Sequence, residues 1–189
     1  MNKFFTRSLL LVVIVSLFSC AAEDRDDVQS AAFNGTDLST TLAPSDLVGT
    51  WNLSVMQADT PVDLNSDGTS NNNILNETNC FDQMGVVFRE DMTFTATNAK
   101  LGFSGGIDND EITCESGRAD SGTWDVDGDV LVLDINVGGI IYTERKQLTI
   151  TPTTFAFAVT KFESDKYVSD PGDSSASPIR ILSLEYAKN

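Results

Sequence analysis

The chain of 189 residues has no histidine, and this absence removes several kinds of chemistry. Serine and cysteine nucleophiles lose their usual imidazole base, and zinc enzymes lose their commonest ligand. The glycine-containing stretch at 102–106 lacks the lysine that a phosphate-binding loop requires. Glycosidase chemistry needs only a pair of carboxylates, but no pair stands out among the 28 acidic residues. We therefore predict that the protein is not an enzyme.

Basic residues are also scarce, because 12 Lys and Arg stand against 28 Asp and Glu, for a formal net charge of −16. If Lys3 and Arg7 leave with an N-terminal signal, 12 minus 2 basic residues remain against 28 acidic ones, which makes the charge of the mature chain about −18. A surface this acidic repels the phosphates of nucleic acids and anionic lipid headgroups. We expect no nucleic-acid partner.

Long hydrophobic stretches are lacking too. An uncharged apolar run at 9–18 follows Lys3 and Arg7, and it is far shorter than the ~20 residues of a membrane-spanning helix. A short positive region followed by such a run and by small residues is typical of a cleaved targeting peptide. We predict that residues 1–19 form this signal peptide.

The sequence Leu-Phe-Ser-Cys at 17–20 resembles the lipobox of bacterial lipoproteins. The resemblance implies that the thiol of Cys20 receives a diacylglycerol and that Cys20 becomes the new N-terminus, so that the protein is held on a membrane by two or three acyl chains. The alternative is an ordinary secretory peptide that is cut after Ala21 or Ala22.

Residues 20–45 are polar and poor in large apolar side chains, which predicts a lipidated, flexible tether. The acidic stretch at 23–27 resembles a sorting signal of Gram-negative lipoproteins and implies the outer membrane, on its periplasmic face or at the cell surface. A plain solvated linker is the alternative for this stretch.

Cysteine is rare, with three residues in the chain. If Cys20 carries lipid, Cys80 and Cys114 are an even pair in an oxidising compartment, and we predict a disulfide between them. The closed loop of about 35 residues would stabilise the fold by roughly 3–4 kcal/mol. A zinc site is excluded because two thiols have no histidine partners here.

Residues 46–189 predict one all-β domain. Apolar side chains alternate with polar ones in two places, at 51–55 and from Val86 to Thr97 around a turn at Glu90 and Asp91. Turn residues such as Asp127-Gly128 and Gly138-Gly139 separate further segments that are rich in β-branched and aromatic residues, at 130–137, 140–150, 153–162 and 179–186. We predict an antiparallel up-and-down β-barrel of about eight strands, and we expect a monomer. A two-sheet β-sandwich is the alternative.

The first strand also carries a family resemblance. Gly49-Thr50-Trp51, followed by Cys80, Cys114 and the Gly-Thr-Trp at 122–124, resembles the lipocalin-like domains of bacterial lipoproteins. The resemblance implies that Trp51 closes the floor of the barrel, where its one N–H donor caps a backbone carbonyl. It also implies a late basic residue, Arg180, that stacks on the Trp51 ring.

Lipocalins bind small apolar or amphipathic molecules, so the resemblance implies a cavity lined by inward-facing side chains. We predict this ligand site at Phe94, Leu133, Tyr142, Phe155, Phe157 and Leu184. The alternative is a barrel filled by these same side chains and used as a scaffold. Irregular loops at 66–79 and 101–115 would then contact an envelope protein or a glycan.

The stretch at 63–69 is similar to the first half of an EF-hand calcium loop, because acidic and amide side chains occupy positions one, three and five and glycine occupies position six. The predicted calcium ligands are Asp63, Asn65, Asp67, the carbonyl of Thr69, and Asn73. Position twelve is Ile74 instead of a bidentate acid. The alternative is a turn in which short polar side chains bond their own backbone. No other cofactor is expected.

Overall fold

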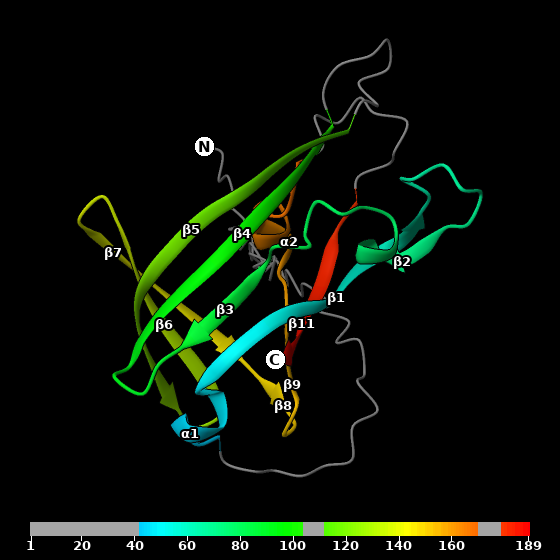
Figure 1. Ribbon diagram of the computed structural model, residues 1–189. Coiled ribbons are helices and arrows are strands. Elements are labelled where there is room, and N and C mark those ends of the chain that lie inside the picture. The colour runs from blue at the N-terminus through cyan, green and yellow to red at the C-terminus, as the bar shows by residue number, and fades with distance from the viewer. Residues whose placement is uncertain (1–41, 104–111, 170–178) are drawn as a thin grey trace, which may run out of the picture. The chain divides into compact units, whose positions relative to one another are not determined.

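The computed structural model describes residues 42–103, 112–169 and 179–189 (Figure 1). The predictions for the signal peptide, for Cys20 and for most of the tether lie outside these residues. None of the helices in the described part is long and apolar enough to cross a membrane.

Strands make up most of the described chain, and the helices are single turns. The helical turns are α1 (Pro44–Leu47), η1 (Ile74–Asn76) and α2 (Lys161–Ser164). The strands are β1 (Gly49–Val62), β2 (Asn71–Asn73), β3 (Gly85–Phe88), β4 (Thr93–Phe103), β5 (Ile112–Asp127), β6 (Val130–Val137), β7 (Ile140–Gln147), β8 (Thr149–Ile150), β9 (Thr154–Ala158), β10 (Val168–Ser169) and β11 (Ile181–Lys188).

The strands form one strongly curled sheet in the order β7-β6-β5-β4-β3-β1-β11-β9-β8 (Figure 1). Pairing along this order is antiparallel throughout, and β3 to β7 follow one another as a meander. The ends of the order, β7 and β8, are consecutive in the chain with only Leu148 between them, and β7 approaches β9. The prediction of an all-β, antiparallel, barrel-like fold is confirmed, as a half-barrel.

Tight two-residue turns explain why the meander is so regular. Gly128 lies between β5 and β6 with a φ of 69°, and Gly138 and Gly139 join β6 to β7 with φ values of 61° and 87°. Glycine reaches this left-handed region without the steric cost that a Cβ brings, and such turns match the twist of paired strands. The predicted bounds of the strand at 130–137 are therefore confirmed.

Trp51, near the start of β1, is completely buried, and its role as the floor of a barrel stays a prediction. Its indole N–H donates to the carbonyl of Leu47 at 2.7 Å, which ties α1 to β1. Its ring meets Phe155 edge to face, with centroids 5.0 Å apart. The basic residue over the Trp51 ring is Lys188, with its Nζ 5.0 Å from the centroid. The stacking predicted for Arg180 is wrong, because the backbone of Arg180 is paired with Asp59 instead.

Two segments differ from their sequence-based predictions. The strand expected at 153–162 ends at Ala158, because Thr160 and Glu163 form a capping box that starts α2. The irregular loop expected at 101–115 is largely strand in its described part, since β4 runs to Phe103 and β5 begins at Ile112. Helix α1 lies across the predicted boundary between tether and domain at residue 45, and the chain is already buried at Leu42.

Candidate functional site

The concave side of the sheet is crossed by the segment from α2 to β10. Ser164 accepts from the Ile181 N–H of β11 at 2.8 Å, and β10 pairs in parallel with β4 at Leu101 and Gly102. β11 and β4 are separated by β1 and β3 in the sheet, so the segment connects strands that are not neighbours. Its ion pairs to β7, described next, place it on the side of the sheet that carries the core. We call residues 159–169 the crossing segment.

Ion pairs tie the crossing segment to β7. Lys146 of β7 pairs with Glu163, and Lys166 pairs with Glu144 at 2.5 Å. Lys146 and Glu144 lie on the face of β7 that carries the core, because their cross-strand partners in β6 are Leu131 and Leu133. The Lys146 ammonium also lies 5.3 Å from the centroid of the Phe157 ring. Charged side chains therefore occupy space that a barrel ligand would need.

The electrostatics of this cluster follow from burial and pairing. Burial raises the pKa of Glu163, but the hydrogen bonds from Lys146 and Thr160 outweigh it, so the net pKa lies below the ordinary value of 4.5. Burial also raises the pKa of Tyr167, and the nearby carboxylates of Glu144 and Glu163 raise it further. Tyr167 is thus a neutral phenol at any physiological pH.

The residues predicted to line a ligand cavity are mostly packed core. Phe94, Phe155 and Leu184 are buried, and Leu133 and Phe157 are partly buried against the same core. The stacking of Phe155 on Tyr186, with centroids 5.0 Å apart, shows how tightly this region is filled.

Tyr142 differs from the other five predicted ligand residues. It is 52% exposed, so its prediction as an enclosed cavity residue is wrong. Tyr142 opposes Ile135 and lies on the same face of β7 as Glu144, but it is close to the end of the hairpin, where the packed core does not reach it.

A hollow of about 280 Å³ lies elsewhere, where the turn before β4 meets β5 and β6. It is lined by Met92, Thr123, Trp124, Asp125, Val132 and Asp134. None of these is a predicted ligand residue, and the exposed Asp125 makes the hollow a poor match for an apolar ligand.

The predicted calcium loop is folded on itself. Asp63 accepts from the backbone N–H groups of Asp67 and Gly68 at 3.1 and 2.9 Å, and Asn65 accepts from Asp67 at 2.9 Å. Asp67 in turn accepts from the Thr69 N–H at 2.7 Å. These are the bonds of the alternative, self-bonded turn, and calcium binding at this loop stays a prediction.

Asn73, the fifth predicted ligand, is engaged elsewhere. Its side-chain oxygen accepts from the backbone N–H groups of Met56 and Leu75, where it caps η1. Glu77 lies closer to the loop: it is buried, and its carboxylate accepts from the Leu64 N–H at 3.1 Å and from the Asn71 amide at 2.5 Å. Within the described ranges, no three acidic or cysteine side chains are grouped as a metal site.

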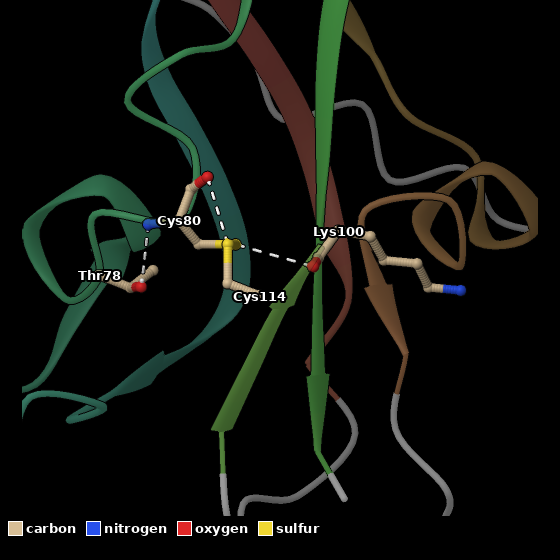
Figure 2. Close-up of a disulfide and its surroundings, with 4 residues drawn as sticks. All are labelled: Thr78, Cys80, Lys100 and Cys114. Carbon is tan, nitrogen blue, oxygen red and sulfur yellow. Dashed lines mark hydrogen bonds between the residues drawn. A yellow bond between two sulfur atoms is a disulfide. The ribbon is translucent and has the colours of Figure 1, made fainter. Parts of the chain in front are cut away.

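The predicted disulfide is confirmed between Cys80 and Cys114, which are 34 positions apart (Figure 2). Cys114 lies in β5 opposite Leu101 of β4, and Cys80 follows η1 in the long connection between β1 and β3. The Cys80 N–H donates to the Thr78 hydroxyl at 3.2 Å. The bond thus fastens an irregular connection onto the longest hairpin of the sheet.

The tip of the β6–β7 hairpin is a surface that sequence reasoning missed. Large apolar side chains are exposed there, at Val137, Ile140, Ile141 and Tyr142. The signal was present in the sequence, because a Gly-Gly turn flanked on both sides by large apolar residues places them at the end of a hairpin.

In the described residues, these observations define an all-β, antiparallel half-barrel with a packed core, a disulfide between Cys80 and Cys114 and an exposed apolar hairpin tip. The chain belongs to a family described as a domain of unknown function (DUF5004), whose model matches residues 23–170. That match ends before β11, which is nevertheless central to the sheet between β1 and β9. No curated protein and no solved structure matches the chain.

Proposed function

We propose that this chain is a non-enzymatic, lipid-anchored protein of the bacterial outer membrane whose filled half-barrel is a scaffold that binds an envelope protein or a glycan. The observation that carries the proposal is the occupied concave side. The crossing segment spans it, with its Glu163 paired to the buried Lys146.

The filled interior favours a scaffold over a carrier of small molecules. A lipocalin-type site needs an apolar cavity of several hundred Å³ with few polar groups. Here Phe94, Phe155 and Leu184 are packed against neighbours, and the rest of the concave side carries ion pairs. A bound apolar molecule would have to displace the crossing segment and leave those charges without partners, which is costly.

The anchor supports the same proposal. Cys20 and Leu42, the first residue that the structure describes, are separated by 21 residues, which can extend to about 70 Å. A scaffold on such a tether stays on its membrane and can still reach a partner. The net charge of −16 favours a partner that is not itself strongly acidic.

Native mass spectrometry tests the filled interior. The full chain is purified in a neutral detergent and measured before and after incubation with a lipid extract of the envelope. We expect the mass of the acylated chain and no further stoichiometric addition. A discrete apolar molecule bound one to one would contradict the scaffold and favour the small-molecule reading.

Cell fractionation tests the anchor. Cys20→Ser is expected to release the protein from the membrane fraction, whereas Cys114→Ser, the matched cysteine control, leaves it there. Membrane association that persists in Cys20→Ser would refute anchoring through this thiol.

A further inference from the structure

The exposed apolar side chains of the described residues are concentrated at one place. Six large hydrophobic residues are exposed in the described part of the chain, and four of them belong to the β6–β7 tip. These four are 52% to 59% exposed: Val137, Ile140, Ile141 and Tyr142. Val137, Ile140 and Tyr142 share one face of the hairpin, and Ile141 lies on the other. Apolar side chains gathered at one place mark an interaction surface more often than scattered single residues do.

The same residues lie on an open edge of the sheet. β7 is the last strand of the order, and within the described ranges β6 is the only strand that pairs with it. Val137 and Ile140 flank a two-residue turn, so they form a hydrogen-bonded pair, and such pairs recur at every second residue. The backbone groups of Ile141, Thr143 and Arg145 therefore point away from β6, toward the open edge.

Only half of this edge is protected against pairing with another strand. Inward-pointing charges discourage strand addition, and Glu144 and Lys146 supply them in the second half of β7, where they are also tied to the crossing segment. The first half, from Ile140 to Thr143, has no charged side chain. The unprotected backbone and the exposed apolar side chains thus coincide.

We propose that the edge of β7 from Ile140 to Arg145 binds an extended, basic segment of a partner protein by strand addition. The inference rests on the proposed scaffold function and names its binding surface. Backbone hydrogen bonds would supply affinity, and apolar side chains at alternate positions of the partner would cover Ile140 and Tyr142 on one face of the strand.

Charge selects the class of occupant. A formal net charge of −16 attracts a basic segment and repels a second copy of the same chain. An anionic lipid surface is disfavoured for the same reason. A basic peptide with apolar residues at alternate positions therefore fits both the edge and the field around it.

The test uses two variants of one residue. The N–H of Thr143 points to the open edge, so Thr143→Pro removes an edge donor and adds bulk without breaking the β6–β7 ladder. Thr143→Ala keeps the N–H and loses the same side-chain hydrogen bond to Asp134, which makes it the matched control. Equal melting temperatures of the two variants show that the fold is intact in both.

The probe is a fluorescein-labelled peptide of sequence Lys-Val-Thr-Val-Lys-Val-Thr-Val-Lys, and binding to the full chain in neutral detergent is followed by anisotropy. We expect saturable binding to the wild type and to Thr143→Ala, at least tenfold weaker binding to Thr143→Pro, and none of a peptide with Glu in place of Lys. Binding should weaken as salt is raised.

Equal affinity of Thr143→Pro and Thr143→Ala, equal binding of the acidic peptide, or no binding of the basic one would overturn the proposal. Self-association through the tip, seen by sedimentation and lost in Thr143→Pro, would overturn it in favour of a second copy. None of these results bears on whether a small apolar molecule is bound or on the membrane fraction, so the filled interior and the anchor are judged separately.

Discussion

Gly122 shows how a single residue sets the distance between two strands. A methyl group at Gly122 would lie 1.9 Å from the carbonyl oxygen of Asp134 in β6, and backbone cannot move aside as a flexible side chain can. We expect Gly122→Ala to destabilise the fold by roughly 2–3 kcal/mol in urea unfolding, as overpacking does. Ser121→Ala, at the exposed neighbouring position, should stay within about 0.5 kcal/mol of the wild type. Similar losses in both variants would contradict the close approach.

The turn at 63–69 gives a prediction about metal binding. Millimolar calcium is expected to raise the melting temperature of the wild type, because ion binding to the folded state alone stabilises it. Asp63→Ala removes a predicted ligand and should show no calcium-dependent shift. Equal shifts in the two proteins, or none in the wild type, would leave the self-bonded turn as the whole role of Asp63.

At the residue scale, the sequence predicted which residues are important in the core better than it predicted which side chains they contact. The burial of Trp51 and the pairing of Cys80 with Cys114 were within reach, because a large ring at a strand start and an even cysteine pair each allow few outcomes. The position of Lys188 over the Trp51 ring was not predictable, since Arg180 and Lys188 both lie near the C-terminus and only the register of β11 against β1 selects Lys188. The burial of Glu77 could not be predicted either, because it depends on the conformation of a loop, and a loop has no periodic pattern in the sequence.

At the scale of elements, the disulfide joins the η1 connection to β5. Reduction is expected to lower stability by roughly 3–4 kcal/mol, because the unfolded chain regains the entropy of a closed loop of about 35 residues. Urea unfolding with and without dithiothreitol measures this. The Cys80→Ala/Cys114→Ala variant should be insensitive to the reductant, and a wild type that is equally insensitive would argue against a stabilising bond.

The ion pairs between β7 and the crossing segment predict a dependence on pH. The folded-state pKa of Glu163 is lowered, so its carboxylate stabilises the fold above its ordinary pKa of 4.5, and this stabilisation is lost as the pH falls through the lowered value. We expect the loss of stability on acidification from about pH 5 to 3 to be smaller in Glu163→Gln than in the wild type. Thermal unfolding across that range measures it.

The matched control for this pH experiment is Asp91→Asn. The hydrogen bonds from Thr93 also lower the pKa of Asp91, but Asp91 lies in the turn before β4 and has no part in the crossing segment. At neutral pH, Asp91→Asn should leave the hydrogen exchange of the crossing segment unchanged, whereas Glu163→Gln, which loses the ion pair with Lys146, should accelerate it. An equal loss of stability on acidification in the wild type and in Glu163→Gln would contradict a stabilising role of the Glu163 carboxylate.

Among the elements, the strands with clear turn residues at both ends were predictable and those of mixed pattern were not. β6 has Gly128 before it and Gly138 after it, and its predicted bounds hold. In β7, apolar and charged side chains follow one another without alternation, so the inward face that carries Glu144 and Lys146 was not visible. Helix α2 was missed because the β-branched and aromatic run at 153–162 outweighed a capping box of one turn.

At the scale of the whole chain, the fold class could be predicted because many short strands with turn residues between them favour a meander. Whether the interior was hollow could not be predicted. That depends on where residues 159–169 run, and a segment of mixed character can cross the sheet or lie outside it. The position of β11 between β1 and β9, which brings the last strand against the first, likewise follows from long-range pairing.

The central claim is that the crossing segment occupies the concave side, and hydrogen exchange of the full chain measures it most directly. The Leu101 N–H donates to the carbonyl of Tyr167 at 2.8 Å, and the Ile181 N–H donates to the Ser164 hydroxyl at 2.8 Å. Both amides are expected to exchange as slowly as those in the centre of β1, with or without added lipid extract. Exchange at these two amides as fast as in the exposed turn at 63–69, or a slowing only when lipid is added, would contradict a filled half-barrel.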